Sequence, residues 1–279
     1  MKPVVISISN QKGGVGKTAT ALNLAVALAV KMRRFQFKEG YKEKVLLIDS
    51  DHQASVTRYF NTNILPPENS LPAIYKEDPV KLCPQIIYTT EIPSLSLVPS
   101  TMYLAAEEPL VLSRIGPGDR MKIFLDNNAQ EFGIVIIDNP PALNVFVNNN
   151  LRASDYVLVP LTPTAEAFEG VNILHSYISR MRTINEDLDI LGYVVTLMQE
   201  RLPIQKEYKK AIAKKFGDKY LGDIHQAASM LKAATNRQPI SIYEKSSRSA
   251  QEHSGIAKKI LHILQERLGI LGFPGETEN

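Results

Sequence analysis

The chain has 279 residues, of which 44% are hydrophobic and 22% charged, as expected of a globular protein with one large core. The single cysteine, Cys83, excludes a disulfide framework or a cysteine-rich metal site within one chain and fits a reducing, cytosolic setting. The net charge of +3 does not by itself indicate nucleic acid binding, which must be argued from local clusters of basic residues.

Short apolar runs bounded by turn residues alternate with helical patterns, which is typical of βαβ units and a mostly parallel sheet. The runs lack clean alternation of apolar and polar residues, as expected for strands covered on both faces. In chain order they predict strands at 4–8, 45–48, 95–98, 134–137, 156–159 and 190–197. The intervening segments predict helices at 17–31, 102–113, 119–129, 165–183, 204–216, 225–235 and 247–268.

These elements predict a single domain over residues 1–272, an α/β fold with a doubly wound, mostly parallel sheet and helices on both faces. The proline-rich stretch 62–93 is expected to be a loop-rich excursion, and 273–279 a frayed, flexible acidic tail. No signal-peptide core opens the chain, and its apolar stretches are too short to span a bilayer. We therefore expect a cytoplasmic protein.

A glycine-rich segment, SNQKGGVGKT at residues 9–18, follows the first predicted strand and leads into the first predicted helix. Its glycines let consecutive N–H groups point at phosphate, and the helix adds its positive N-terminal dipole. Lys17 would reach the β- and γ-phosphates, and the Thr18 hydroxyl would ligate magnesium. An accidental glycine turn is the alternative. The predicted nucleotide-binding residues are Gly13, Gly14, Val15, Gly16, Lys17, Thr18 and Ala19.

Acidic residues follow two of the predicted strands, at the edge where open α/β sheets bind their ligands. Asp49 and Asp51 follow the strand at 45–48, and Asp138 follows the strand at 134–137. Asp138 is expected to hold magnesium through a water molecule, and Pro140 and Pro141 to stiffen the segment beside the γ-phosphate. For Asp49 alone, an ordinary helix cap is an alternative role.

The loop departs from the standard pattern G-x-x-x-x-G-K-[ST], because Gln11 occupies the position of its first glycine. What stands here, K-G-G-x-G-K-T with a further lysine at Lys12, resembles the deviant Walker A box of the ParA/MinD family of P-loop ATPases. The resemblance implies ATP and Mg²⁺ as cofactors, and a Lys12 that reaches the partner's phosphates across a nucleotide-sandwich dimer. A second cation there could neutralise charge that develops during phosphoryl transfer. A solvated loop lysine is the alternative.

The D-x-D step at Asp49 and Asp51 resembles the first switch of the same family. On that match Asp51 positions or deprotonates the attacking water, and Asp49 supports the magnesium shell. His52 stands where the family usually has proline, which puts the stiffness of this switch in question. Stretches 154–163 and 165–170 also match, so the resemblance runs in order from residue 4 to about residue 175. It implies a catalytic set of Lys12, Lys17 and Asp51 and a metal set of Thr18, Asp49 and Asp138.

One basic helical face is a candidate for contacting DNA. Lysines at four-residue spacing share a face of the predicted helix 204–216, opposite an apolar stripe of Tyr208, Ile212 and Phe216. Further basic residues follow in the region where ParA-type relatives carry DNA-contacting residues. The predicted DNA-binding residues are Lys206, Lys210, Lys214, Arg237, Lys245 and Arg248. The alternative is that a lysine-rich face merely keeps the helix soluble.

Other members of the family bind membranes, through a terminal amphipathic helix, or use paired cysteines for a cluster or zinc. The single Cys83 excludes the second class in its usual pattern. An apolar stripe at 256–271 could lie on lipid. Its residues are Ile256, Ile260, Ile263, Leu264 and Leu268. We expect this stripe to pack on the sheet, since the acidic tail would be repelled by anionic lipid, and the membrane is therefore disfavoured as a partner.

The segment 31–44, KMRRFQFKEGYKEK, is about ten residues longer than the turn usual in the family. Its basic and aromatic residues indicate either a specialised DNA or partner contact or a tolerated surface insertion.

The resemblance therefore implies a ParA-type ATPase that forms a homodimer around ATP and Mg²⁺ and binds non-specific DNA when loaded. It would position or segregate a cargo with a cargo-bound adaptor protein that stimulates hydrolysis, and would be cytoplasmic and nucleoid-associated. The alternatives are a MinD-like membrane-associated ATPase and a nucleotide-dependent scaffold with negligible hydrolysis. No residue distinguishes a plasmid, a chromosome or a protein microcompartment such as a carboxysome as the cargo.

Overall fold

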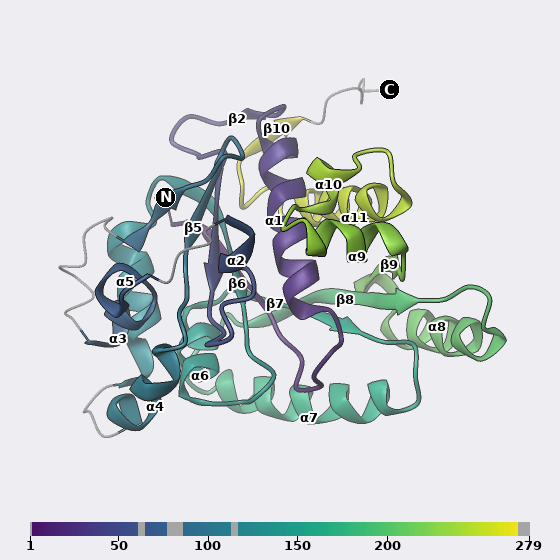
Figure 1. Ribbon diagram of the computed structural model, residues 1–279, viewed down its shortest axis with the longest axis horizontal. Coiled ribbons are helices and arrows are strands. Elements are labelled where there is room, and N and C mark those ends of the chain that lie inside the picture. Colours follow the sequence, from purple (N-terminus) through teal and green to yellow (C-terminus); the bar gives the residue numbers. More distant parts are fainter. Residues whose placement is uncertain (1, 61–64, 77–85, 113–116, 273–279) are drawn as a thin grey trace.

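The computed structural model describes residues 2–60, 65–76, 86–112 and 117–272. Within them the chain forms an eight-stranded sheet, a separate two-stranded sheet and helices on both faces of the larger sheet (Figure 1). Cys83 and the tail 273–279 lie outside the described residues, as does part of the proline-rich excursion 62–93. The described helices include none with the length and apolar character needed to cross a membrane.

The strands are β1 (Val4–Ile8), β2 (Gln36–Phe37), β3 (Lys44–Asp49), β4 (Tyr88–Thr89), β5 (Leu95–Val98), β6 (Phe132–Asp138), β7 (Tyr156–Leu161), β8 (Asp189–Met198), β9 (Tyr220–His225) and β10 (Ile270–Gly272). The larger sheet has the order β4-β5-β3-β6-β1-β7-β8-β9. All its neighbouring pairs are parallel except β4 with β5. The prediction of a doubly wound, mostly parallel sheet is confirmed.

The α-helices are α1 (Lys17–Met32), α2 (Thr57–Phe60), α3 (Pro72–Lys76), α4 (Leu104–Leu112), α5 (Arg120–Asn128), α6 (Val145–Ala153), α7 (Glu166–Met181), α8 (Pro203–Phe216), α9 (Ala228–Thr235), α10 (Ile240–Tyr243) and α11 (Arg248–Ile263). Short 3₁₀ turns are η1 (Pro67–Asn69), η3 (Pro117–Asp119) and η4 (Gly217–Lys219). Helices α1 and α11 pack side by side on one face of the larger sheet (Figure 1). Helices α3 to α8 cover the other face.

Strand β1, which is apolar except for Ser7, shows why the central strands lack an alternation of apolar and polar residues. Its five residues are all buried, because alternate side chains enter the cores on opposite faces of the sheet. Val4, Ile6 and Ile8 pack under α1 and α11, while Val5 packs on the side of α5 and α6. Burial on both faces makes this part of the sheet a rigid platform for whatever the strand ends carry.

The structure corrects several of the predicted elements. The helix predicted at 225–235 starts too early, because His225 ends strand β9, which was not predicted. Gly222 and Asp223 interrupt the apolar pattern of that strand. Helix α6 was also missed, since three consecutive asparagines obscure its periodicity. The last helix ends at Ile263 rather than at 268.

The apolar stripe of the last helix packs as expected. Ile256 and Ile260 are buried against α1, and Leu264 and Leu268 continue the buried stripe beyond the end of α11. Ile263 alone of the predicted stripe faces outward, with 51% of its surface exposed. The face that the membrane alternative assigns to lipid is therefore occupied by the protein's own core.

The insertion at 31–44 folds onto the C-terminal end of the described chain. Strand β2 pairs antiparallel with β10, and the two lie together at one end of the molecule (Figure 1). The Lys38 N–H donates to the Gly269 carbonyl at 2.8 Å. Gly269 has φ +60°, and a Cβ there would come within 2.5 Å of the Tyr41 ring. This close approach requires glycine, so the insertion is anchored and not a free loop.

Candidate active site

The glycine-rich loop and both acidic segments lie at the carboxyl ends of three adjacent strands, β3, β6 and β1. In the strand register Asp138 stands beside Asp49 on one side and beside Ile8, which leads into the loop, on the other. The sequence prediction that these segments converge at one edge of the sheet is therefore met by the topology. It is the edge at which parallel α/β sheets bind ligands.

The loop between β1 and α1 has the backbone that a phosphate cradle requires. Gly14 and Gly16 adopt φ values of +70° and +77°, which residues with a Cβ rarely adopt. Nothing lies within 4 Å of the place where a Cβ would stand on Gly13 or Gly14, so this side of the loop is open. The other side is fixed, because the Thr196 hydroxyl donates to the Val15 carbonyl at 2.8 Å.

Lys17 begins α1 and points back across the loop. Its Nζ donates to the Lys12 carbonyl at 2.9 Å. Burial lowers the pKa of Lys17, whereas the nearby carboxylates of Asp138 and Asp51 raise it. The ammonium group thus lies between the loop backbone and the acidic segments, which is where the β- and γ-phosphates of a bound nucleotide would need a cation.

Asp49 is fully buried and holds the segment that follows it. Its Oδ2 accepts hydrogen bonds from the Thr57 N–H and the Thr57 hydroxyl, both at 2.8 Å. Its Oδ1 accepts the Asp51 N–H at 3.3 Å. Burial raises the pKa of Asp49 to about 6, and these hydrogen bonds oppose the rise. Through Thr57, the side chain of Asp49 at the end of β3 anchors the start of α2.

Asp138 is a buried carboxylate with unmet hydrogen-bonding capacity. Among the described residues, neither of its oxygens has a hydrogen-bond partner. Burial raises its pKa well above the usual value, and the neighbouring Asp49 raises it further, while the nearby Thr18 hydroxyl and Lys17 oppose the rise. A buried, unpaired carboxylate requires an explanation, and a cation beside it supplies one.

The donor set fits Mg²⁺ better than a metal held only by protein. Within the described ranges no three His, Cys, Asp or Glu side chains are grouped so that they could hold a metal ion. Magnesium typically takes one or two protein ligands together with substrate phosphates and water. Thr18 and Asp138, beside an open phosphate loop, match that preference.

Asp51 lies in a turn organised by short-range contacts. Its Oδ1 accepts the Gln53 N–H at 2.9 Å and lies 3.4 Å from the Nδ1 of His52. The other ring nitrogen of His52 is 2.9 Å from the side-chain nitrogen of Gln53. Ala54 closes the turn with φ +51°, a conformation that costs a non-glycine residue energy. The family that the sequence resembles usually has a stiff proline at position 52. Here the contacts among Asp51, His52 and Gln53 hold the turn instead.

Lys12 stands at the rim of the loop with its side chain 42% exposed. Its N–H donates to the side-chain oxygen of Asn10 at 3.0 Å, and the Asn10 amide nitrogen donates to the Pro160 carbonyl at 2.8 Å. The Nζ of Lys12 lies 3.6 Å from a carboxylate oxygen of Glu166, the first residue of α7. The backbone of Lys12 is thus tied down while its charged end is accessible.

A buried asparagine that contacts both acidic segments was not identified from the sequence. Asn150 on α6 is fully buried, and its side-chain nitrogen donates to the Ser50 hydroxyl at 2.7 Å and to the side-chain oxygen of Asn139 at 2.8 Å. Ser50 lies between Asp49 and Asp51, and Asn139 follows Asp138. The run of asparagines at 148–150 was the signal available, because consecutive asparagines are poor helix formers.

The predicted basic face of α8 is present. Lys206, Lys210 and Lys214 are exposed, whereas Ile212 on the opposite side is buried. Arg237 and Lys245, which follow α9 and α10, are exposed as well. These side chains are exposed enough to contact phosphate groups, but their contact with DNA stays a prediction.

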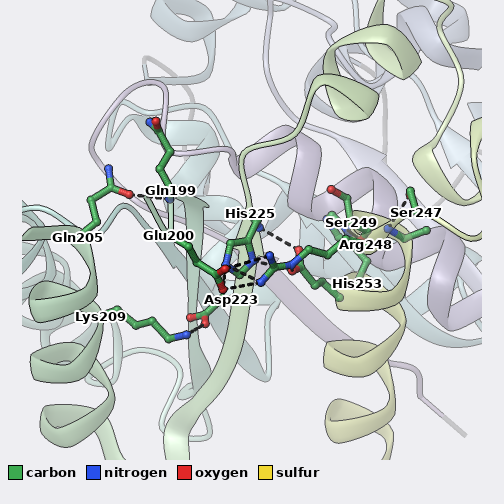
Figure 2. A network of polar contacts seen from close by, with 12 residues as sticks. Gln199, Glu200, Gln205, Lys209, Asp223, His225, Ser247, Arg248, Ser249 and His253 are labelled. Carbon is green, nitrogen blue, oxygen red and sulfur yellow. Dashed lines mark hydrogen bonds and ion pairs between the residues drawn. The ribbon is translucent and has the colours of Figure 1, made fainter. Parts of the chain in front are cut away.

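Arg248 differs from the other predicted DNA contacts because its guanidinium is already engaged. It lies 2.7 Å from Glu200 and 2.8 Å from Glu252, and its side chain reaches the ring of His225 at 2.9 Å (Figure 2). The two carboxylates raise its pKa. A contact between Arg248 and a DNA phosphate would require these ion pairs to break.

The same network borders a cavity of about 620 Å³ at the carboxyl ends of β8 and β9. Its lining includes Met198 and Gln199 after β8, His225 after β9, and Arg248 at the start of α11. Strand β8 connects this cavity to the phosphate loop, since Thr196 contacts the loop and Met198, two residues later, lines the cavity.

Comparison with known proteins gives consistent matches over nearly the whole chain. Residues 3–190 match the AAA domain family. The sporulation initiation inhibitor protein Soj of Bacillus subtilis is 31% identical over 258 residues, covering 92% of this chain and 97% of Soj. The chromosome partitioning protein ParA of Caulobacter vibrioides is 30% identical over 268 residues, covering 94% and 96% of the two chains. The structure of a Borrelia burgdorferi plasmid partition protein bound to AMPPNP is 25% identical, with a TM-score of 0.76 over 94% of this chain and 100% of that chain.

Proposed function

This chain belongs to the ParA/MinD family of P-loop ATPases, and we propose that it is a ParA-type ATPase that partitions or positions a cargo on DNA. Two relatives of near-equal length are named for sporulation control and chromosome partitioning, and a structural neighbour for plasmid partition. The proposal comprises ATP hydrolysis with Mg²⁺, a homodimer in the ATP-bound state, non-specific DNA binding, and an adaptor protein that stimulates hydrolysis.

The observation that carries the hydrolytic function is the position of Lys17, between the loop backbone and the carboxylates of Asp51 and Asp138. The open faces of Gly13 and Gly14 would receive the phosphates, and Lys17 would bind the β- and γ-phosphates. Thr18 and Asp138 would hold Mg²⁺, which when bound neutralises phosphate charge. Asp51 would orient the attacking water. Hydrolysis is then mainly positioning and charge stabilisation.

The same site suggests where the base of the nucleotide would lie. The cavity beyond β8 and β9 starts two residues after Thr196, which contacts the phosphate loop. Bases and other flat rings bind in concave sites lined partly by apolar side chains with a few polar groups, and this cavity combines Met198 and Leu231 with Gln199 and His225.

Dimerisation on ATP is proposed because of Lys12. Its side chain is at the rim, and in this single chain it has only the exposed carboxylate of Glu166 as a charged neighbour within 4 Å among the described residues. An exposed ion pair of this kind contributes little to stability, so Lys12 is available to a stronger anion. The phosphates of a nucleotide held by a second copy of the chain would be such an anion.

DNA is the favoured surface for the loaded dimer. The lysines of α8 are exposed and periodic, and a dimer would present this face twice, which strengthens binding to a phosphate backbone. The MinD-like alternative relies on an apolar stripe that this fold buries in its own core. A cytoplasmic, nucleoid-associated location follows from the DNA proposal.

The deciding measurement is DNA binding by the purified protein with ATP, with ADP and without nucleotide, over a series of salt concentrations. We expect binding with ATP only, a steep decrease with salt, and no binding by Lys12→Ala. Equal DNA binding with and without ATP would contradict the proposal that ATP controls DNA binding. Failure to bind DNA in any nucleotide state would reject the ParA-type role, and binding to liposomes would then be measured next.

Hydrolysis is tested separately from DNA binding. Single-turnover measurements of ATP hydrolysis by the unchanged protein and by Asp51→Ala distinguish an ATPase from a nucleotide-dependent scaffold. In an ATPase the substitution lowers the hydrolysis rate, whereas a scaffold has no measurable rate in either form. If the unchanged protein binds ATP and DNA but converts no ATP to ADP even with its adaptor, the scaffold alternative is correct.

A further inference from the structure

The side chain of Asn150, on helix α6, links the acidic segment that follows β3 to the one that follows β6. One side-chain amide donates both its hydrogen bonds into them, to the Ser50 hydroxyl at 2.7 Å and to Asn139 at 2.8 Å. All three residues are buried, with at most 1% of their surface exposed. Hydrogen bonds in such surroundings are strong, and a partner left behind by a deletion cannot be satisfied by solvent.

Hydrogen bonds to backbone carbonyls tie Ser50 and Asn139 into the sheet. The Ser50 N–H donates to the Asp138 carbonyl at 3.0 Å, and the side-chain nitrogen of Asn139 donates to the Ile8 carbonyl at 3.2 Å. Ser50 and Asn139 are therefore each one residue away from an acid of the site and each bound to a second strand. Asn150 completes this arrangement by fixing the side chains of both.

The side-chain oxygen of Asn150 indicates that stability alone does not account for this residue. Among the described residues it has no hydrogen-bond partner although it is buried. An unpaired buried acceptor costs stability, and such costs persist mainly where function offsets them. An alanine or leucine at this helix position would remove the unpaired oxygen, but the Ser50 hydroxyl and the Asn139 side-chain oxygen would then lose the donor that Asn150 supplies.

We propose that Asn150 is a positioning residue for nucleotide hydrolysis, an inference that rests on the proposed ATPase function. It holds Ser50 and Asn139 in one arrangement and thereby keeps Asp51 and Asp138 in register with each other. Asn150 is buried and its side chain contacts the acidic segments at Ser50 and Asn139. Any effect of Asn150 on hydrolysis therefore passes through these two residues. Groups that orient ligands in this way typically change metal affinity or activity about 10- to 100-fold when removed.

The neighbouring Asn149 is a matched control. It is also fully buried on α6, and its side chain likewise makes two hydrogen bonds. Its nitrogen donates to the Val145 carbonyl at 2.9 Å and its oxygen accepts the Arg120 N–H at 3.0 Å. The first of these contacts lies within α6, the second joins α6 to the start of α5, and neither involves an acid of the site. Asn149→Ala should therefore destabilise the protein about as much as Asn150→Ala does, without the same effect on the site.

The test compares the two alanine variants in two assays. For Asn150→Ala we expect kcat to fall about tenfold with the KM for ATP changed less than about twofold, and the Mg²⁺ concentration that half-saturates binding of a fluorescent ADP analogue to rise about tenfold. For Asn149→Ala we expect both quantities to stay within about twofold. Equal effects of the two variants, or no change in either assay for Asn150→Ala, would overturn the proposal.

A milder variant covers the case in which Asn150→Ala does not fold. Ser50→Ala removes one of the two contacts and keeps the asparagine, and it should raise the half-saturating Mg²⁺ concentration in the same direction. If Ser50→Ala leaves it unchanged, the proposal fails. The Mg²⁺ assay needs no turnover, so a protein that binds Mg²⁺–nucleotide with this dependence on Asn150 but never hydrolyses ATP would reject the ATPase function and leave the positioning role supported.

Discussion

Lys12 and Glu166 face each other at the mouth of the phosphate-binding loop, with Nζ and a carboxylate oxygen 3.6 Å apart. One residue comes from the loop after β1 and the other starts α7, so the pair spans two elements far apart in the chain. The nearby Thr164 hydroxyl lowers the pKa of Glu166 most, and Lys12 lowers it further. In the proposed dimer Lys12 would exchange this carboxylate for phosphate.

The first prediction concerns this exchange. Glu166→Gln removes the charge that competes for Lys12, so ATP-dependent dimerisation should be unchanged or at most about threefold tighter, because exposed ion pairs are weak. Lys12→Ala should abolish dimerisation. Light scattering at increasing protein concentration, with ATP and with ADP, measures both. Weaker dimerisation of Glu166→Gln would mean that Glu166 itself contacts the partner.

The second prediction concerns the buried charge of Asp138. Asp138→Asn removes a carboxylate that lacks a hydrogen-bond partner among the described residues and is close to another acid, so the nucleotide-free, magnesium-free protein should melt at least ~2 °C higher at pH 8. The same variant should lose about 10- to 100-fold of the Mg²⁺-dependent hydrolysis. Calorimetry and a phosphate-release assay test the two effects. A lower melting temperature would show that the charge is satisfied in the folded protein.

The third prediction is a pH dependence with a defined sign. Burial raises the pKa of Asp49 to about 6 and that of Asp138 well above its usual value, whereas in the unfolded chain both are near 3.9. The folded, metal-free protein therefore binds more protons than the unfolded chain, and these two groups make it more stable as the pH falls from 8 towards 5. Melting temperatures across this range should rise less in Asp138→Asn than in the unchanged protein. Parallel curves for the two proteins would contradict the prediction.

The fourth prediction separates two effects at glycines of the insertion and its anchor. Gly40 and Gly269 both have positive φ, but only at Gly269 would a Cβ meet the Tyr41 ring, at 2.5 Å. Gly40→Ala should cost about 1 kcal/mol from backbone strain, and Gly269→Ala clearly more because packing is also disturbed. Urea unfolding gives both values. Equal costs would mean that the ring of Tyr41 moves aside freely.

The fifth prediction compares two basic surfaces. Replacing Lys206, Lys210 and Lys214 by alanine should weaken ATP-dependent DNA binding and reduce the slope of log affinity against log salt by roughly one for each phosphate that is no longer neutralised. Replacing Lys38, Lys42 and Lys44 of the insertion changes the net charge equally and serves as the control. If the control variant has the larger effect, the insertion and not α8 is the DNA-contacting surface.

The parts of this protein that could be predicted from sequence are those specified locally. Strand β1 is apolar except for Ser7, and the glycine-rich segment 9–18 follows it, so strand, loop and helix could be placed in order. The acids that end β3 and β6 were predicted to meet because parallel strands bring their carboxyl ends to one edge. The core stripe of α11 followed from helical periodicity.

The rest depends on contacts between distant segments. Ser50, Asn139 and Asn150 come together only through the strand order, and no spacing in the sequence signals that meeting. Strand β9 was missed because its glycine and aspartate resemble a turn. The pairing of β2 with β10 was missed for a simpler reason, since strands of two or three residues carry almost no pattern.

The pairing of β2 with β10 also has a consequence for the order in which the molecule forms during synthesis. Phe37 leaves the ribosome more than two hundred residues before its partner Ile270. At translation rates of about 5–20 residues per second, β2 therefore waits on the order of ten seconds or more for β10. The small sheet can close only after the last helix has been made. A nascent chain would therefore hold an unpaired insertion throughout that interval.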